Sequence, residues 1–336
     1  MGLDVFESKI ALIGGSGFIG QRMVRYLTTA GHVVKIIDIA APPASRPDVA
    51  YENCDVRDLP ALTEAIRGHD LVINLAAAHR DDVRPVSLYH DVNVQGAQNV
   101  CDAAGACGIE RILFTSSVAI YGLQEGVPGE DTPAKPFNLY GETKWQAEKV
   151  YASWFRKAPQ RRQLLMVRPT VVFGPGNRGN VYGLIKQLAS GFFIMIGDGK
   201  NRKSMAYVEN IASFLAYLAQ DRTPGETVYN YVDKPDFSMN ELLRVVRTAL
   251  GNRSDSKVRL PYFAGMAIAS LFDAAAAVTG RSFPISRVRV QKFCANTVFD
   301  AQRLSRTGFV PVASLADALS LTIAHEFPRG RQDSRR

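Results

Sequence analysis

The sequence is poor in cysteine, with four in 336 residues, and these four form no CxxC pair. Cys54, Cys101, Cys107 and Cys294 also lack the spacing of a zinc site. Disulfide scaffolds and structural zinc modules are therefore excluded as interpretations. Because disulfides persist in oxidising compartments, we expect reduced thiols, no bound metal and a cytoplasmic protein.

A long hydrophobic run and a basic stripe are missing as well. The most apolar stretch, 262–280, is alanine-rich, contains Asp273 and follows Pro261, so we expect no integral membrane span. We interpret it as a buried or lid helix, and peripheral membrane contact stays open as the alternative. The net charge of +8 is dispersed and accompanies no reader motif, so we expect no nucleic-acid partner. Acids at Asp4 and Glu7 argue against a signal peptide.

What the sequence does contain is an ordinary globular composition, 46% hydrophobic and 21% charged. Its first half alternates strand and helix patterns, which predicts an α/β fold with a doubly wound parallel sheet over residues 1–175. Beyond Pro175 the alternation stops, and Val228–Val232 is the one clear strand. We expect a smaller, interleaved, mixed α/β lobe over 176–330, followed by a basic tail at 331–336.

A glycine-rich turn at 14–20 follows an apolar run at 9–13 and precedes an amphipathic helix at 21–30. This order suits a dinucleotide pyrophosphate, because glycines admit the phosphates and the helix N-terminus offers free N–H groups. The spacing alone also fits a turn that binds nothing. Asp38 favours the functional interpretation, since it lies about twenty residues further on, where an acid accepts hydrogen bonds from the ribose hydroxyls.

Tyr140 and Lys144 stand four residues apart, which places them on one face of a helix. A lysine charge and an oxidised nicotinamide ring would lower the phenol pKa from its usual value of about 10. Tyr140 could then take a proton from a sugar hydroxyl, and Ser117, after the fifth strand, could bind the same oxygen. The alternative for such a pair is a solvated helix face.

The ordered motifs resemble the extended short-chain dehydrogenase/reductases, and within them the NAD-dependent nucleotide-sugar epimerase/dehydratase family of UDP-glucose 4-epimerase type. The segments that carry the resemblance are Gly14-xx-Gly17-xx-Gly20, Asp55-Val56, Asn74-Leu75-Ala76-Ala77, Ser116-Ser117, Tyr121-Gly122, Tyr140-xxx-Lys144, 168–177 and 205–210. The resemblance covers nearly the whole chain.

The resemblance implies a Rossmann fold, a catalytic triad of Ser117, Tyr140 and Lys144, NAD as cofactor, a nucleotide-diphosphate sugar as substrate and a homodimer. The residues it assigns to the cofactor are Gly14, Gly17, Phe18, Ile19, Gly20, Asp38, Asp55, Val56, Ala76, Ala77, Asn93, Tyr140 and Lys144. The residues it assigns to the substrate are His79, Ser117, Asn180, Arg202 and Arg289. No arginine follows Asp38 directly, which favours NAD over NADP, although Arg46 in the next loop could weaken that preference.

Val118 and Ala119 separate family members by reaction. Dehydratases and decarboxylases of this group have acids there, and the fucose-synthase type has a cysteine; this chain has neither. We therefore expect a 4-epimerase that passes through a transient 4-keto sugar, with Tyr140 as base and acid. A 4-keto-6-deoxysugar reductase and a non-catalytic dinucleotide-binding protein are the alternatives. Val171 replaces a substrate-contacting Asn of several epimerases, so the sugar stays open.

Overall fold

The computed structural model describes residues 7–44, 46–80, 83–191, 193–251, 259–279 and 286–328. Its contacts divide the chain into two compact units. The first unit contains 1–172, 206–232 and 299–313, and the second contains 173–205, 233–298 and 314–336. Two segments beyond residue 175 thus return to the first unit. The predicted basic tail lies outside the described residues.

The first unit is built on a sheet of seven strands in the order β10-β6-β5-β4-β1-β2-β3, with every pairing parallel. Its strands are β1 (Lys9–Ile13), β2 (Val33–Asp38), β3 (Ala50–Asn53), β4 (Leu71–Asn74), β5 (Arg111–Thr115), β6 (Gln163–Pro169) and β10 (Gly225–Tyr231). The sheet extends in opposite directions from β1 and β4. The carboxyl ends of these two strands therefore flank the position where open α/β sheets bind ligands.

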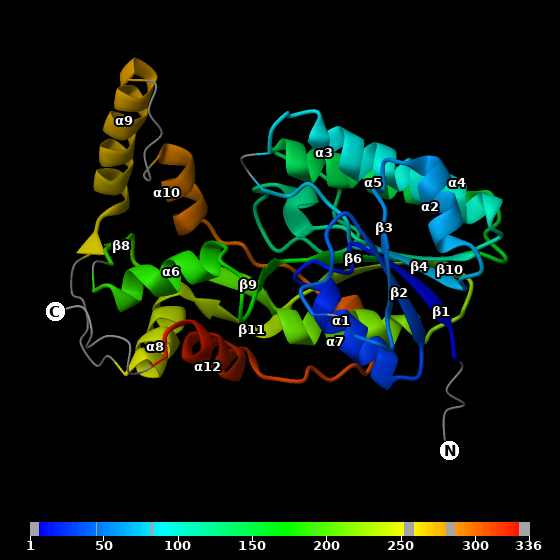
Figure 1. Cartoon of the computed structure of the whole chain (residues 1–336). Coiled ribbons are helices and arrows are strands. Elements are labelled where there is room, and N and C mark those ends of the chain that lie inside the picture. The colour runs from blue at the N-terminus through cyan, green and yellow to red at the C-terminus, as the bar shows by residue number, and fades with distance from the viewer. Residues whose placement is uncertain are drawn as a thin grey trace. The chain divides into compact units, whose positions relative to one another are not determined.

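Helices cover both faces of this sheet (Figure 1). On β1, Ile10 and Leu12 belong to one apolar cluster and Ala11 and Ile13 to the other, because successive side chains point to opposite faces. The helices and turns of the unit are α1 (Gly20–Thr29), α2 (Leu59–Ile66), α3 (Leu88–His90), a π-helical turn (Asp91–Gln95), α4 (Gly96–Ala106), a 3₁₀ turn (Val118–Tyr121), α5 (Leu139–Arg156), α7 (Val208–Ala219) and α11 (Gln302–Ser305). Helices α1 and α7 pack on one face and α2, α4 and α5 on the other. The expected Rossmann-type, doubly wound sheet is confirmed.

Strand β10 differs from the sequence-based expectation, which placed it in the second lobe. It pairs in parallel with β6 along its whole length, from Gly225 opposite Gln163 to Tyr231 opposite Pro169. The reason is helix α7, which precedes β10 and supplies the crossover that two parallel strands need. The βα alternation therefore continues through this later segment.

The second unit mixes helices with short strands. Its helices are α6 (Asn180–Ala189), α8 (Met239–Leu250), α9 (Tyr262–Thr279), α10 (Arg287–Cys294) and α12 (Leu315–Glu326). A two-stranded sheet joins β8 (Met195–Ile196) and β12 (Arg259–Leu260). A three-stranded sheet has the order β11-β9-β7, and its residues 171–172 and 206–207 are counted with the first unit. These last strands are β11 (Asp233–Ser238), β9 (Arg202–Tyr207) and β7 (Val171–Phe173). Helix α8 begins with a reciprocal capping box between Ser238 and Glu241.

Candidate active site

The glycine turn between β1 and α1 has no room for side chains at Gly14, Gly17 and Gly20. Gly14 has φ +75°, and a Cβ there would lie 2.7 Å from the backbone nitrogen of Ala76. A Cβ on Gly20 would lie 2.5 Å from the carbonyl oxygen of Gly15, and one on Gly17 3.1 Å from that of Gly14. The turn therefore lies directly against the carboxyl end of β4, and α1 begins directly after it.

Asp38, at the end of β2, bonds to this turn. Its Oδ2 accepts the Ser16 N–H at 3.0 Å and its Oδ1 accepts the Ala40 N–H at 3.1 Å, which leaves each oxygen one lone pair for a ribose hydroxyl. The Ser16 hydroxyl is buried and finds no hydrogen-bond partner among the described residues. An orphaned hydroxyl beside a closed glycine turn fits a bound pyrophosphate. Sequence reasoning missed Ser16, although a polar residue inside the turn was a signal.

The residues expected around the adenosine are held by local contacts. Asp55 forms a bidentate ion pair with Arg57, whose hydrogen bonds lower the Asp55 pKa below its usual value. Val56 is buried, and a Cβ on Gly96 would lie 2.9 Å from its Cγ1. Arg46, the residue that could favour NADP, is ion-paired with Asp48 at 2.6 Å.

Ala76 and Ala77 belong to a loop at the end of β4 that two asparagines fix. Asn74 Oδ1 accepts the Ala76 N–H at 3.0 Å. Asn93, in the π-helical turn, binds both the N–H and the carbonyl of Ala78, and its amide also donates to Thr143 Oγ1 at 2.9 Å. Asn93 thus ties the β4 loop to α5. π-Helical turns frequently mark functional sites.

The structure brings Ser117, Tyr140 and Lys144 together around the start of α5. Ser117 ends the segment after β5, and its Oγ accepts the Ala119 N–H at 3.1 Å. The hydroxyl of Tyr140, a partly exposed residue, is hydrogen-bonded to Ser117. Lys144 is buried; its Nζ donates to the Thr115 carbonyl at 2.7 Å and lies 4.6 Å from the Phe114 ring centroid. A substrate hydroxyl could reach Tyr140 and Ser117 at once, while Lys144 supplies positive charge from below.

Gly141 makes this approach possible, and sequence reasoning did not single it out. Asn138 caps the helix by accepting the Gly141 N–H at 2.9 Å. A Cβ on Gly141 would lie 2.4 Å from the carbonyl oxygen of Ala119, in the 3₁₀ turn after Ser117. Helix α5 can therefore lie close enough to this turn for Tyr140 and Ser117 to bond. The signal was a glycine inside the Tyr-xxx-Lys spacing.

Burial is the main cause of the pKa shifts of Tyr140 and Lys144. It raises the Tyr140 pKa above its ordinary value, against the opposing hydrogen bond to Ser117. Burial also lowers the Lys144 pKa to about 7, while the charge of Glu148, one helical turn further, raises it. The pKa of Lys144 thus lies where a further charge nearby changes its protonation, whereas burial keeps the Tyr140 phenol protonated.

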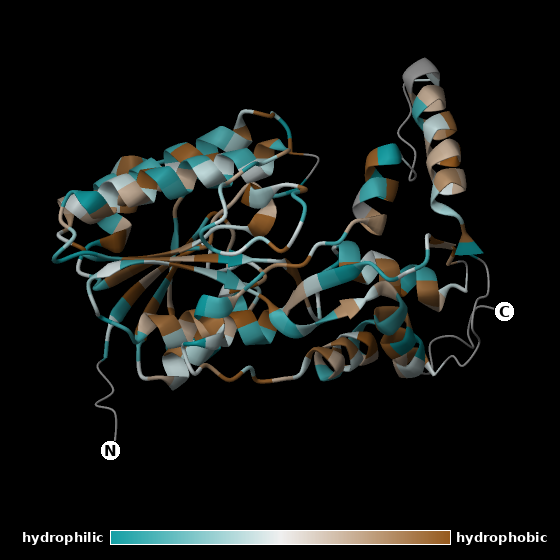
Figure 2. Cartoon of the chain, turned by 180° about the vertical axis from the view of Figure 1, so that it is seen from behind, coloured by the Kyte–Doolittle hydropathy of each residue, from teal (hydrophilic) through white to brown (hydrophobic). Residues whose placement is uncertain are grey.

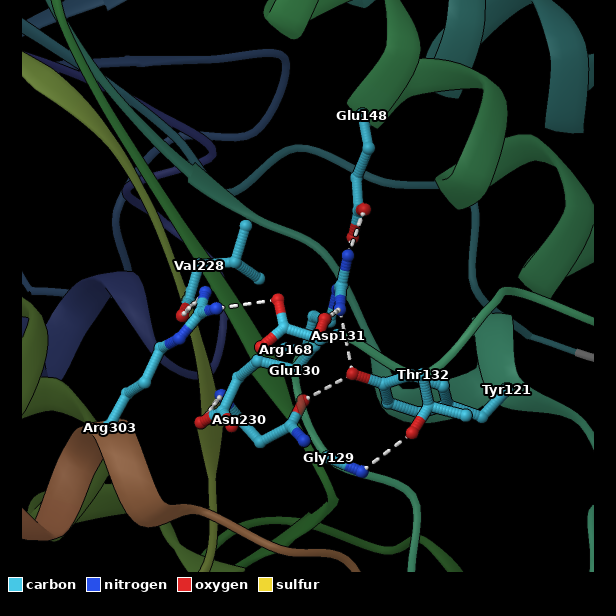
Figure 3. A network of polar contacts seen from close by, with 10 residues as sticks. All are labelled: Tyr121, Gly129, Glu130, Asp131, Thr132, Glu148, Arg168, Val228, Asn230 and Arg303. Atoms are coloured by element: carbon cyan, nitrogen blue, oxygen red, sulfur yellow. Dashed lines mark hydrogen bonds and ion pairs between the residues drawn. The ribbon is translucent and has the colours of Figure 1, made fainter.

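Glu148, whose charge acts on Lys144, belongs to a buried polar network (Figure 3). Arg168 forms two hydrogen bonds with Glu148, at 2.9 and 2.7 Å, and both residues are buried. Arg168 also donates to the Tyr121 hydroxyl at 2.7 Å, and Tyr121 donates to Asn230 at 2.8 Å. Burial lowers the Arg168 pKa, but the hydrogen bond and charge of Glu148 outweigh burial and leave it above its ordinary value. The network fixes α5 against β6 and β10.

The predicted substrate residues come from both units. His79 is exposed in the loop after β4, where its Nδ1 lies 3.4 Å from the Ala77 carbonyl oxygen. In the second unit, Asn180 begins α6, Arg289 lies in α10, and Arg202 at the start of β9 donates to the Asp236 carbonyl at 2.6 Å. These four assignments stay predictions.

The glycine turn, the acid at the end of β2 and the Ser–Tyr–Lys cluster are arranged as the sequence resemblance implies. A model of the "NAD dependent epimerase/dehydratase family" matches residues 10–231, about two thirds of the chain. The chain belongs to this family. The family expected from the sequence and its NAD dependence are thereby confirmed.

Individual relatives of this NAD-dependent epimerase/dehydratase add detail. The chain is 47% identical over 327 residues to the N-acetyl-alpha-D-glucosaminyl-diphospho-ditrans,octacis-undecaprenol 4-epimerase of Escherichia coli O157:H7, covering 97% of this chain and 98% of that one. It is 28% identical over 253 residues to the UDP-glucose 4-epimerase of Vibrio cholerae, covering 72% and 76%. Its fold matches the UDP-glucuronic acid 4-epimerase from Bacillus cereus in complex with NAD, with a TM-score of 0.72, 21% identity and coverage of 94% and 98%.

Proposed function

We propose that the protein is an NAD-dependent 4-epimerase of an N-acetylhexosamine that is linked through a diphosphate to a polyprenol. The observation that carries this proposal is the 47% identity to a 4-epimerase of that substrate class over nearly the full length of both chains. The nucleotide-linked sugar expected from the sequence shares the sugar diphosphate, and it differs only in the carrier beyond the second phosphate.

The residues present fit a dinucleotide. Gly14, Gly17 and Gly20 carry no side chains where the turn is tightest, and the Ser16 hydroxyl within the turn is orphaned. Asp38 keeps lone pairs for ribose hydroxyls, and Arg46 is occupied by Asp48, which supports NAD over NADP. When bound, NAD supplies a hydride acceptor for the sugar C4 and a donor that returns the hydride to the opposite face.

The protein's own part in the reaction is proton transfer at O4. Ser117 holds the 4-hydroxyl and the Tyr140 phenol, and Tyr140 removes the hydroxyl proton as the carbonyl forms. Because burial raises the Tyr140 pKa, this transfer needs the positive charge of Lys144 and of the oxidised nicotinamide ring. Tyr140 returns the proton when the keto sugar is reduced from its other face. Val118 and Ala119 offer no acid for dehydration.

Parallel incubations with N-acetylglucosaminyl-diphospho-polyprenol and with UDP-N-acetylglucosamine test the proposal. We expect the polyprenol-linked sugar to equilibrate with its 4-epimer, with no net formation of NADH. Faster turnover of the UDP sugar would overturn the choice of carrier. A protein that stays inert until it receives a 4-keto sugar and reduced cofactor, and then consumes one reduced cofactor per product, would be a reductase and would overturn the epimerase.

A further inference from the structure

Helix α9 in the second unit exposes its large apolar side chains. Phe263 is 77% exposed and Leu271 72%, and Tyr262 and Ile268 are exposed beside them. Phe263, Ala267, Leu271 and Ala274 recur at intervals of three or four residues and are all exposed, so they form one stripe along the helix. We call these four residues the α9 stripe. Figure 2 shows the hydrophobic colour running along this helix.

The opposite side of α9 holds small residues against the rest of the unit. Gly265 and Ala269 are buried, and a Cβ on Gly265 would lie 2.7 Å from Cγ2 of Ile196 in β8. Asp273, the one charged residue of α9, accepts the Arg287 N–H at the start of α10 at 3.1 Å. The helix therefore uses its small residues and its acid for internal packing, and it leaves Phe263, Ile268 and Leu271 exposed.

The sequence on either side of α9 is basic. Residues 251–295 contain seven Lys or Arg and two Asp or Glu, which is a net charge of +5 out of +8 for the whole chain. Among the described residues, Arg259 in β12 and Arg287 and Arg289 in α10 are exposed. An apolar helical stripe flanked by cations complements a surface with an apolar interior and anionic headgroups.

We propose that the α9 stripe and the adjoining arginines dock the protein on the surface of an anionic phospholipid bilayer. The choice of occupant rests in part on the proposed function, because a polyprenol chain resides in a bilayer and its enzyme must work at that surface. The helix lies in the interface and does not cross it: among the residues that the structure describes, no helix has the length and apolarity of a membrane span.

Co-sedimentation of the full chain with vesicles tests this docking. The wild type is expected to bind phosphatidylcholine vesicles that contain phosphatidylglycerol, and to bind pure phosphatidylcholine at least about threefold more weakly. The double variant Phe263→Ser/Leu271→Ser is expected to bind the anionic vesicles at least about tenfold more weakly. Arg287→Gln/Arg289→Gln is expected to remove the preference for phosphatidylglycerol.

The matched control is Val310→Ser/Val312→Ser, which replaces two exposed apolar residues of the first unit, 78% and 54% exposed, and is expected to bind as the wild type does. Equal binding by the α9 variant and the control would overturn the proposal. A wild-type dimer that the α9 variant converts to monomers in light scattering would also overturn it, because a second copy would then cover the stripe.

Turnover of a short-chain, water-soluble prenyl-diphosphate sugar, measured without vesicles, tests the proposed epimerase activity independently of membrane docking. The α9 variant is expected to turn over that substrate at the wild-type rate, which supports a role in docking alone. If the wild type does not bind vesicles but still turns over this substrate, the docking is overturned and the epimerase stands. Vesicle binding without any epimerisation would support the docking and overturn the function.

Discussion

Helices α5 and α9 are both 18 residues long, and they distribute polar and apolar side chains in opposite ways. Helix α5 buries Lys144 and Glu148, each 2% exposed, whereas α9 exposes Phe263 and Leu271. A buried charge needs hydrogen-bond or ion-pair partners, and a contiguous exposed apolar surface marks an interaction site. On the proposals made above, the first unit contains the catalytic residues and the second unit contains a surface for a partner.

The largest effect is expected at the start of α5. Tyr140→Phe removes only the phenolic oxygen, and it should lower kcat by about 10²–10⁴-fold, the usual contribution of a general acid–base group. Stability and NAD binding should stay near the wild type. Tyr217→Phe is the control, since it loses one exposed hydroxyl bonded to the Thr307 carbonyl. More than about a tenth of wild-type turnover in Tyr140→Phe would exclude Tyr140 as the base.

The next effect concerns the buried pair behind Lys144. Glu148→Gln leaves the Arg168 charge buried and unpaired, so it should lower the free energy of unfolding by about 3–5 kcal/mol. Glu110→Gln breaks an ion pair with Arg161 whose side chains are 42% and 71% exposed, and it should cost less than about 1 kcal/mol. Denaturant unfolding measures both. An equal decrease in the free energy of unfolding in the two variants would mean that the network does not stabilise α5.

How far the sequence predicts the site depends on how local each contact is. The glycine turn, Asp38 and the Tyr140–Lys144 spacing are visible because each belongs to one strand, turn or helix. The Glu148–Arg168 pair joins residues twenty positions apart, and Gly141 is needed because of Ala119, on a different segment. Such contacts depend on how elements pack, which no local pattern encodes.

The same limit applies to the fold. The βα alternation of the first half predicts the parallel sheet, because each strand and helix has its own hydrophobic period. The placement of β10 beside β6 was not predicted, since glycine- and asparagine-rich residues after Pro175 interrupt the pattern before it resumes. For α9, composition predicted a helix, but a run of alanines does not say which side faces the protein.

Lys144 itself makes stability depend on pH. Burial lowers its pKa to about 7 from its ordinary value of 10.5, so between these values the unfolded chain holds a proton that the folded protein has released. Stability from this group therefore rises with pH across that window, by at most about 1.4 kcal/mol per pH unit. Lys144→Met should remove this pH dependence. The free energy of unfolding of the variant should therefore exceed that of the wild type by most near pH 7 and by least near pH 10. If the free energies of unfolding of the cofactor-free wild type and variant change with pH in the same way, this pKa is contradicted.

The smallest effect is expected on α9. Because Leu271 is 72% exposed, Leu271→Ala should change the free energy of unfolding by less than about 0.5 kcal/mol. Leu242→Ala on α8, where the side chain is 2% exposed, should cost about 2–5 kcal/mol. Thermal or denaturant unfolding compares them. A loss in Leu271→Ala close to that of Leu242→Ala would show that α9 is packed in the free protein, and the contrast with α5 would disappear.

The central claim is that the hydride removed from C4 returns to the same sugar while Tyr140 moves only the hydroxyl proton. The direct measurement uses N-acetylglucosaminyl-diphospho-polyprenol that carries deuterium at C4, followed by mass spectrometry and NMR of the epimer. We expect the 4-epimer to keep its deuterium at C4, in ordinary water and without added reduced cofactor. A product that has lost the label, or no product until reduced cofactor is added, would contradict the account.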